Sequence, residues 1–186
     1  KDALYRKMDK DTKKYVYDIV YLGRLTFQKN PFRLLEIFRK IIDKEHDIKI
    51  AVIGTGDMEE EVHKKAVELN LAPNVELLGF QSNPYKILHD AKVMIMTSRW
   101  EGTPMCVLEA MALGVPIVST PSDGIVDLII SDETGYLSNN DAELINAIEK
   151  ILNNEELQKK LSYNARKRFD ELIDLKKFKE QIIKAY

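Results

Sequence analysis

Two carboxylates eight positions apart, Glu101 and Glu109, flank the start of a predicted helix. Glu101 precedes the helix and is expected to point into a ligand cleft, whereas Glu109 lies about 8 Å along the helix axis among apolar neighbours. A carboxylate in such surroundings needs a partner that offsets its desolvation. Sugar or ribose hydroxyls could supply that partner, and an ion pair from Glu109 to Arg24 or Lys29 is the structural alternative.

The residues between the two glutamates can offer backbone groups to a ligand. Thr103 is a natural N-cap and Pro104 suits the first helical position, so the helix is predicted to begin there. The amides of Met105 and Cys106 then have no helical partners, and Gly102 lets a ligand approach the backbone. No histidine lies near Cys106 in the sequence, so we expect its thiol to serve in packing rather than as a nucleophile.

Two cations, Arg24 and Lys29, follow the first predicted strand. Their loop opens with Gly23 and ends at Pro31, which suits the first position of a helix. A planar guanidinium, an ammonium and free helix amides together suit a diphosphate. Chance placement of two surface cations is the alternative, and the spacing alone does not separate the two interpretations.

These segments lie in an alternating pattern of strands and helices. Continuous apolar runs predict strands at residues 15–22, 48–53, 75–78, 93–97, 116–119 and 135–138. Helical spacing predicts helices at residues 31–44, 58–71, 84–90, 104–113, 124–130, 140–152, 154–171 and 174–186. Strands that are apolar on both faces indicate an α/β fold with a Rossmann-like, doubly wound parallel sheet. Such sheets bind ligands beyond the carboxyl ends of their strands, where the loops above are predicted to lie.

A Gly-x-Gly segment, Gly54 and Gly56, follows the second predicted strand. The dinucleotide fingerprint would need a third glycine where Glu59 stands, so that motif fails, and no P-loop motif occurs in the chain. Backbone that approaches a phosphate is one interpretation of the segment. A tight turn with Asp57 as the helix N-cap is the other.

The composition excludes several classes of protein. With 28 Lys and Arg against 30 Asp and Glu, the net charge of -2 argues against a nucleic-acid binder. No apolar run approaches the ~18 residues that span a bilayer. The single cysteine excludes a disulfide framework and fits a reducing compartment. Residues 1–14 are expected to form a solvated linker, with a basic membrane-surface helix as the alternative, and the start at Lys1 suggests a piece of a longer protein.

The segment from Ser98 to Ala112 reads S-x-x-E-G-x-P-x-x-x-L-E-A-M-A, with an E-x7-E at its centre, and G-V-P-I-V follows. It resembles the signature of glycosyltransferase family 4, the retaining GT-B glycosyltransferases. Further resemblances cover about residues 17 to 170 in the family's order. They are G-R-L…K at residues 23–29, V-I-G-T-G at residues 52–56, N-V-x-x-L-G-F ending at residue 80, and T-G-Y-L at residues 134–137.

The resemblance implies a donor site. Arg24 and Lys29 would neutralise the diphosphate of the donor, Glu101 would bind hydroxyls of the transferred sugar, and Glu109 would bind the ribose. Arg24, Lys29 and Glu101 would be the catalytic residues. Backbone and small groups would complete the donor site at Gly23, Gly54, Gly56, Gly79, Phe80, Gly102, Thr103, Pro104, Met105 and Cys106, with Gly79 and Phe80 near the base.

The implied activity is transfer of a sugar from a UDP- or GDP-sugar to an acceptor hydroxyl with retention of configuration, without a metal or a cofactor. Residues 15–171 resemble only the C-terminal half of a GT-B fold, and residues 172–186 a helix that packs on an N-terminal, acceptor-binding domain. The fragment alone is therefore expected to be inactive. Surface polysaccharide or glycolipid synthesis in the cytoplasm is implied, with peripheral association of the full-length enzyme at the inner face of the membrane. A non-catalytic nucleotide-binding module and another GT-B enzyme, such as a nucleotide-sugar epimerase, are the alternatives.

Two positions depart from the family pattern. Asn30 stands where a glycine usually follows the lysine. The segment Ser122 to Asp127 stands where G-G-x-x-E is common, so Asp127 shortens that carboxylate by one methylene. No role is assigned to Asp127.

Overall fold

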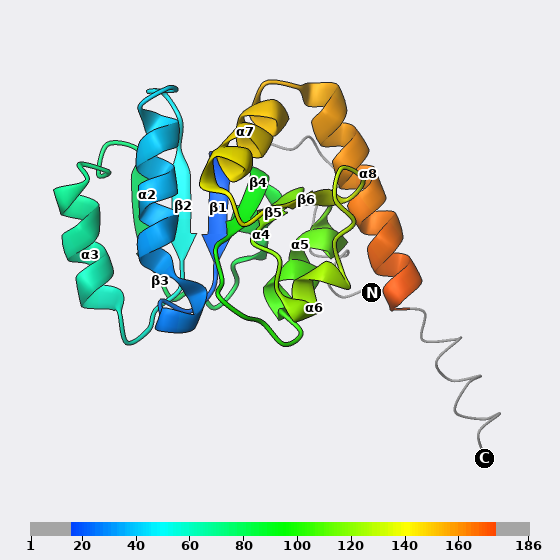
Figure 1. Cartoon of the computed structure of the whole chain (residues 1–186), viewed down its shortest axis with the longest axis horizontal. Coiled ribbons are helices and arrows are strands. Elements are labelled where there is room, and N and C mark those ends of the chain that lie inside the picture. The colour runs from blue at the N-terminus through cyan, green and yellow to red at the C-terminus, as the bar shows by residue number, and fades with distance from the viewer. Residues whose placement is uncertain (1–15, 174–186) are drawn as a thin grey trace, which may run out of the picture.

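Six parallel strands in the order β3-β2-β1-β4-β5-β6 form the centre of the computed structural model, which describes residues 16–173 (Figure 1). The strands are β1 (Tyr17–Leu22), β2 (Ile50–Ile53), β3 (Val75–Gly79), β4 (Ala91–Met96), β5 (Ile117–Ser119) and β6 (Gly135–Leu137). The helices are the 3₁₀ turn η1 (Phe27–Lys29), α2 (Pro31–Ile42), α3 (Glu59–Glu68), α4 (Tyr85–His89), α5 (Met105–Leu113), α6 (Asp123–Val126), α7 (Asp141–Leu152) and α8 (Glu155–Leu172). The predicted Rossmann-like sheet is confirmed. The linker predicted at residues 1–14 and the helix predicted at residues 174–186 lie outside the described residues.

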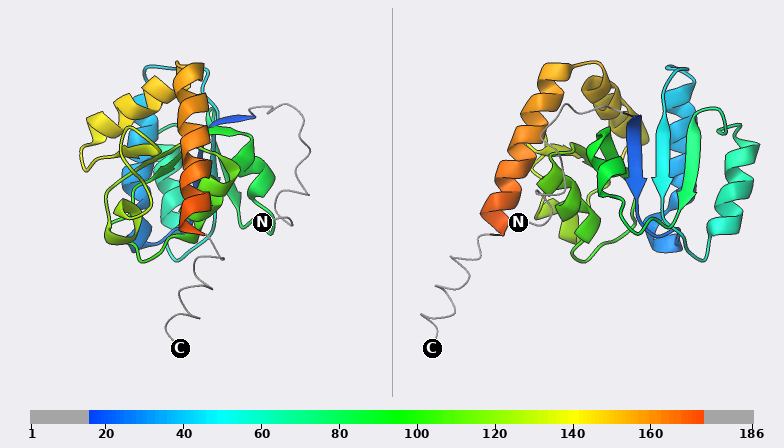
Figure 2. Two further views of the ribbon diagram at one scale, coloured as in Figure 1. Left: turned by 90° about the vertical axis from the view of Figure 1, so that its right-hand side faces the viewer. Right: turned by 180° about the vertical axis from the view of Figure 1, so that it is seen from behind.

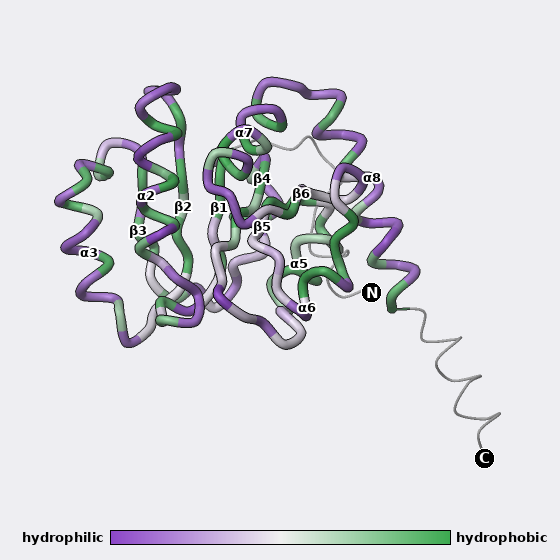
Figure 3. Tube along the Cα trace, in the orientation of Figure 1, coloured by the Kyte–Doolittle hydropathy of each residue, from purple (hydrophilic) through white to green (hydrophobic). Residues whose placement is uncertain are grey.

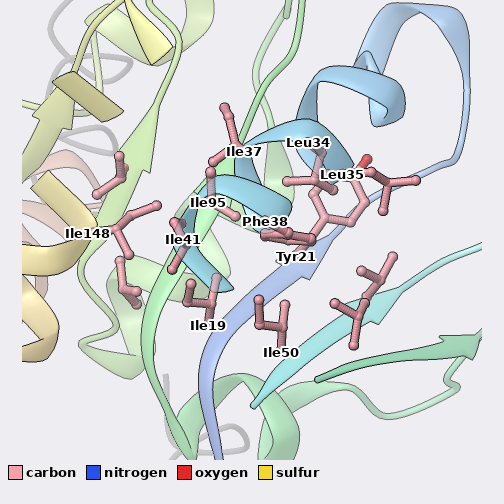
Figure 4. Close-up of a cluster of buried hydrophobic side chains, with 14 of the residues drawn as sticks. Ile19, Tyr21, Leu34, Leu35, Ile37, Phe38, Ile41, Ile50, Ile95 and Ile148 are labelled. Carbon is pink, nitrogen blue, oxygen red and sulfur yellow. The ribbon is translucent and has the colours of Figure 1, made fainter. Parts of the chain in front are cut away.

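The strands are apolar on both faces because helices cover both sides of the sheet. Ile19 and Tyr21 of β1 pack into one core with α2, α3 and α7, whereas Val20 between them packs into a second core with α4 and α5. In Figure 3, green predominates along β1 and β2, whereas the traces of α2 and α3 alternate between green and purple. In Figure 4, Phe38 and Ile41 of α2 lie against the strands in the first core. Burial on both faces explains why the central strands are continuous apolar runs in the sequence.

The winding of the chain reverses between β1 and β4, which are neighbours in the centre of the sheet. Strands β1, β2 and β3 extend the sheet in one direction and β4, β5 and β6 in the other. The arrowheads of β1 and β2 point downward in the right panel of Figure 2, toward the edge where η1 lies. In doubly wound sheets this edge, at the point of reversal, is where ligands bind. The loops after β1 and β4 therefore have the most favourable position for a site.

Local details of three loops differ from the sequence prediction. Helix α5 begins at Met105, and the residue that precedes it is Pro104, whose extended backbone (ψ 104°) keeps it outside the helix. The prediction of Thr103 as N-cap is therefore wrong. Asp57 is not an N-cap either, because Met58 precedes α3. The turn η1 was not predicted, since three residues are too few to show a helical period.

The backbone conformation of Asn30 explains how asparagine can stand where a glycine was expected after the lysine. Asn30 joins η1 to α2 in a left-handed conformation with φ 53°. Glycine adopts this conformation freely, and asparagine is among the few other residues that tolerate it. Pro31 follows as the first residue of α2, as predicted. The asparagine thus preserves the sharp turn that places Lys29 at the edge of the sheet.

Candidate functional site

The loops that follow β1 and β4 are joined by hydrogen bonds. The Arg99 amide donates to the Gln28 carbonyl (2.8 Å), and the Gln28 side-chain amide donates to the Trp100 carbonyl (2.9 Å). The buried Thr97 hydroxyl donates to the Lys29 carbonyl at 3.1 Å. Because β1 and β4 are neighbours in the sheet, the two sequence segments that carry the predicted site residues form one surface.

Lys29 and Glu101 form the centre of that surface. The Lys29 Nζ lies 2.5 Å from Glu101 Oε1, and each residue is only 8% exposed. The Ser98 hydroxyl donates to the same carboxylate. The expectation that Glu101 points openly into a cleft thus needs correction: its side chain is turned inward toward the base of the β1 loop, where the ammonium and the hydroxyl offset its desolvation.

Arg24 lies at the start of the same loop and is exposed. Its backbone is fixed, because the Tyr21 hydroxyl donates to the Arg24 carbonyl at 2.9 Å. Among the described residues, no side chain forms an ion pair or a hydrogen bond with its guanidinium. Within residues 16–173, one paired cation and one without a side-chain partner therefore lie at the same edge of the sheet.

Glu109 lies just over one turn into α5 and is half-buried. Burial raises the pKa of its carboxyl above the ordinary value of 4.5, and the Tyr85 hydroxyl, which donates to Oε1 at 3.3 Å, opposes that rise. The alternative in which Glu109 forms an ion pair with Arg24 or Lys29 is wrong: among residues 16–173 neither cation pairs with it, and Lys29 contacts Glu101 instead. Sequence reasoning did not identify Tyr85, since nothing in the order of residues brings α4 next to α5.

The start of α5 has backbone amides without helical partners. The first amide of this segment that donates to a backbone carbonyl is that of Val107, which bonds to the Pro104 carbonyl at 3.0 Å. The amides of Met105 and Cys106 therefore precede the hydrogen-bonded turns of the helix. A Cβ atom added to Gly102 would meet no atom within 4 Å. As predicted, the amides of Met105 and Cys106 have no partner within the helix, although the helix begins one residue later.

The glycines after β1 and β2 have a packing role in this structure. A Cβ on Gly54, where φ is +137°, would lie 1.9 Å from the Gly23 carbonyl oxygen, and one on Gly56 would lie 2.2 Å from the Leu25 carbonyl oxygen. The two loops therefore need glycine in order to approach each other. Gly79, the last residue of β3, has φ +62° and open space where a Cβ would lie.

Three exposed aromatic side chains border the site, one after β3 and two in the loops after β1 and β4. Phe80, directly after β3, is 75% exposed. Phe27 and Trp100 also are exposed, with ring centroids 6.0 Å apart, and the Arg99 guanidinium lies over the Phe27 ring at 4.3 Å. Sequence reasoning named Phe80 but not the pair of Phe27 and Trp100, which comes from two loops far apart in the chain.

Cys106 lies between the two glutamates and beneath the surface. Its thiol lies 3.7 Å from the Met96 sulfur, and burial raises its pKa to about 11. A thiol with this pKa is protonated at neutral pH. The packing role predicted for Cys106 therefore agrees with its surroundings.

Residues 16–173 contain neither a cluster of metal ligands nor a membrane-spanning helix. Within this part of the chain, no three side chains of the His, Cys, Asp and Glu types lie together as a metal ion would require. None of the described helices has the length and apolarity to cross a bilayer.

Comparison with known proteins identifies relatives for this chain. It is 32% identical over 168 residues to the capsular polysaccharide biosynthesis glycosyltransferase CapM of Staphylococcus aureus, an alignment that covers 89% of this chain and 43% of CapM. It is 30% identical over 175 residues to an Escherichia coli galactosyltransferase named for UDP-Gal and α-D-GlcNAc-diphosphoundecaprenol, covering 87% of this chain and 45% of that enzyme. The chain thus spans less than half the length of both relatives.

Solved structures share the fold. A variant of S. aureus TarM in complex with UDP superimposes with a TM-score of 0.84 at 25% identity, over 95% of this chain and 37% of TarM. Anabaena HepE in complex with UDP and glucose gives a TM-score of 0.81 at 20% identity, over 92% of this chain and 48% of HepE. The sequence profile of the glycosyl transferases group 1 matches residues 4–168. With most of its length matched, the chain belongs to the group 1 glycosyl transferase family.

Proposed function

We propose that this chain is the donor-binding domain of a retaining glycosyltransferase of family 4, which transfers a sugar from a nucleoside diphosphate sugar to an acceptor hydroxyl. The observation that supports the proposal is the buried Lys29–Glu101 ion pair, which joins the loops after β1 and β4 at the point where the sheet reverses its winding. Arg24 lies in the first of these loops, and Glu109 lies on α5, the helix that follows the second. Cations suited to phosphate and carboxylates suited to hydroxyls lie on one surface there.

Each residue has a proposed part in binding the donor. Arg24 and Lys29 bind the diphosphate and offset the negative charge that develops as the sugar departs. Glu101 accepts hydrogen bonds from hydroxyls of the transferred sugar, and Glu109 accepts them from the ribose. The free amides at the start of α5 contact the phosphate or the sugar, and the exposed Phe80 lies next to the base. UDP-sugars and GDP-sugars are the proposed donors, and the step requires no cofactor.

The remaining parts of the proposal concern the longer protein. Because the chain spans 43% of CapM, we propose that a second, N-terminal domain binds the acceptor and closes the other side of the active site. The names of CapM and of the E. coli galactosyltransferase support a role in cytoplasmic synthesis of a surface polysaccharide or glycolipid, including at the inner face of the membrane. By the same reasoning the chain alone lacks transferase activity, and product formation by the purified 186-residue chain would refute that part.

Calorimetric titration tests the donor site directly. UDP or GDP should bind the chain, and Arg24→Ala should weaken that binding by about 1.5–3 kcal/mol, as for a hydrogen bond to a charged group. Binding of uridine or guanosine should hardly change. Lys64→Ala, which removes an exposed cation on α3, is the control and should change neither. Equal loss for nucleotide and nucleoside would refute the assignment of Arg24 to phosphate. Nucleotide binding without transfer by the full-length protein would favour a non-catalytic module.

A further inference from the structure

The two side chains that donate to the Glu101 carboxylate use the same oxygen atom. Lys29 Nζ and Ser98 Oγ each lie 2.5 Å from Oε1. An oxygen of a carboxylate has two lone pairs, so these two donors occupy Oε1 fully. Among residues 16–173, no hydrogen-bond donor contacts Oε2. The carboxylate therefore has one oxygen committed to the protein and one that keeps both lone pairs.

Ser98 itself is held firmly. It is the second residue after β4, next to the buried Thr97, and it is 2% exposed. The Thr120 hydroxyl, from the end of β5, donates to the Ser98 carbonyl at 2.7 Å. The Ser98 hydroxyl has a single proton, and that proton is directed to Oε1 of Glu101. A fixed donor of this kind can set the orientation of a mobile acceptor.

Lys29 cannot set that orientation by itself. An ammonium has three rotatable donors and accepts many directions of approach. The last torsion of a glutamate is broad and roughly two-fold, so a lysine alone could bridge both carboxylate oxygens. If Lys29 also turns toward a diphosphate, as in the proposed function, Ser98 is the group that still contacts Oε1.

We propose that Ser98 is a positioning residue: it fixes the rotation of the Glu101 carboxylate so that Oε2 is kept for two hydroxyl groups of the transferred sugar. The inference rests on the proposed function of Glu101. Ser98 need not touch the sugar or the diphosphate. The Ser98 hydroxyl should therefore affect only the difference in affinity between the nucleotide sugar and the nucleotide.

Ser119 offers a matched control. It is also a buried serine at the carboxyl end of a strand, with 0% exposure. Its hydroxyl donates to the Thr120 carbonyl at 2.9 Å and not to Glu101. Ser119→Ala thus removes a buried hydroxyl from the same edge of the sheet without changing the donors to the carboxylate.

The test measures dissociation constants for UDP, UDP-glucose and UDP-N-acetylglucosamine, with GDP and GDP-mannose as a second series. Ser98→Ala should weaken binding of the nucleotide sugar relative to the nucleotide on the order of tenfold, with less than a twofold change for the nucleotide itself. Ser98→Thr, which keeps the hydroxyl, should retain most of the wild-type ratio, and Ser119→Ala should retain all of it. In a Glu101→Gln background, Ser98→Ala should no longer change the ratio, because it acts through that carboxylate.

The outcomes separate the two proposals. Absence of nucleotide binding by the wild-type chain would overturn the proposed function, and this inference with it. Nucleotide binding with an unchanged ratio in Ser98→Ala would overturn only the role of Ser98. An equal loss for nucleotide and nucleotide sugar, accompanied by a lower melting temperature, would also overturn it by showing that Ser98 supports the fold alone. An effect of Ser98→Ala that persists in the Glu101→Gln background would do the same.

Discussion

The Lys29 ammonium and the Glu101 carboxylate are ion-paired at 2.5 Å although 72 residues separate them in the chain. Both side chains are almost fully buried, so neither charge is well solvated if the other is removed. Breaking a buried pair by removing one partner is strongly destabilising, because it leaves an uncompensated charge. The pair is therefore a part of the fold as well as a part of the candidate site.

Lys29→Ala should lower the free energy of unfolding by about 3–5 kcal/mol, because Glu101 then stays buried without its cation. Arg24→Ala should leave stability nearly unchanged, since Arg24 is exposed. Both variants should weaken binding of a nucleoside diphosphate. Urea denaturation followed by circular dichroism measures the first effect. Adding Glu101→Gln to Lys29→Ala should recover part of the loss, and equal stability of the two single variants would contradict the structural role of the pair.

Glu101→Gln and Glu109→Gln should have different effects on ligand binding. Glu109 is proposed to hold the ribose, so Glu109→Gln should weaken nucleoside diphosphate and nucleotide sugar alike. Glu101→Gln should leave diphosphate affinity nearly intact and lower the rate of transfer in the full-length enzyme, as expected for contacts made with the reacting sugar. Titration calorimetry and steady-state kinetics measure the two effects. The opposite pattern would reverse the assignments.

The stability of the chain should depend on pH through Glu109. Burial raises its pKa above 4.5, so the folded chain favours the protonated form, and ionisation costs stability as the pH rises through that raised pKa. Glu109→Gln should therefore raise the melting temperature at pH 7 relative to wild type, with the gain shrinking as the pH falls toward 4. Tyr85→Phe removes the hydrogen bond that lowers this pKa and should enlarge the pH dependence. A difference between Glu109→Gln and wild type that is constant with pH would contradict this account.

Substitutions of Gly54 and Gly102 should distinguish a glycine that is needed for packing of the loops from one that leaves room for a ligand. Gly54→Ala should lower the free energy of unfolding by more than about 2 kcal/mol, because φ is +137° and the new Cβ would meet the Gly23 carbonyl oxygen at 1.9 Å. Gly102→Ala should leave stability nearly unchanged, since no atom lies within 4 Å of the new Cβ. If a ligand contacts this backbone, Gly102→Ala should nevertheless weaken nucleotide-sugar binding. Unchanged affinity would remove Gly102 from the binding site.

The Cys106 thiol should react slowly with alkylating reagents at neutral pH. Burial raises its pKa to about 11, so only a small fraction is the reactive thiolate at pH 7.5. Labelling with iodoacetamide, followed by mass spectrometry, should be much faster in denaturant than in buffer. Rapid labelling of the folded chain would indicate that the helix start is more open than the structure shows.

Much of the fold could be predicted from the sequence because its strands are buried on both faces. Apolar runs such as the one in β1 have few alternatives, and Gly23 and Gly54 mark their ends. The partners of the site residues could not be predicted, because they depend on which strands are neighbours. Glu109 had two cations as candidate partners, yet its hydrogen bond comes from Tyr85, while Lys29 contacts the other glutamate.

The cross-links between the loops after β1 and β4 have a consequence for the energetics of binding. Ordering one residue of a free loop costs about 1–2 kcal/mol in backbone entropy. Here the hydrogen bonds from Arg99 to Gln28 and from Gln28 to Trp100 restrict both loops when the chain folds. The conformational entropy of these two loop segments is therefore lost during folding rather than on binding. A ligand at this edge does not bear a further cost of ordering them, so its contacts contribute more fully to affinity.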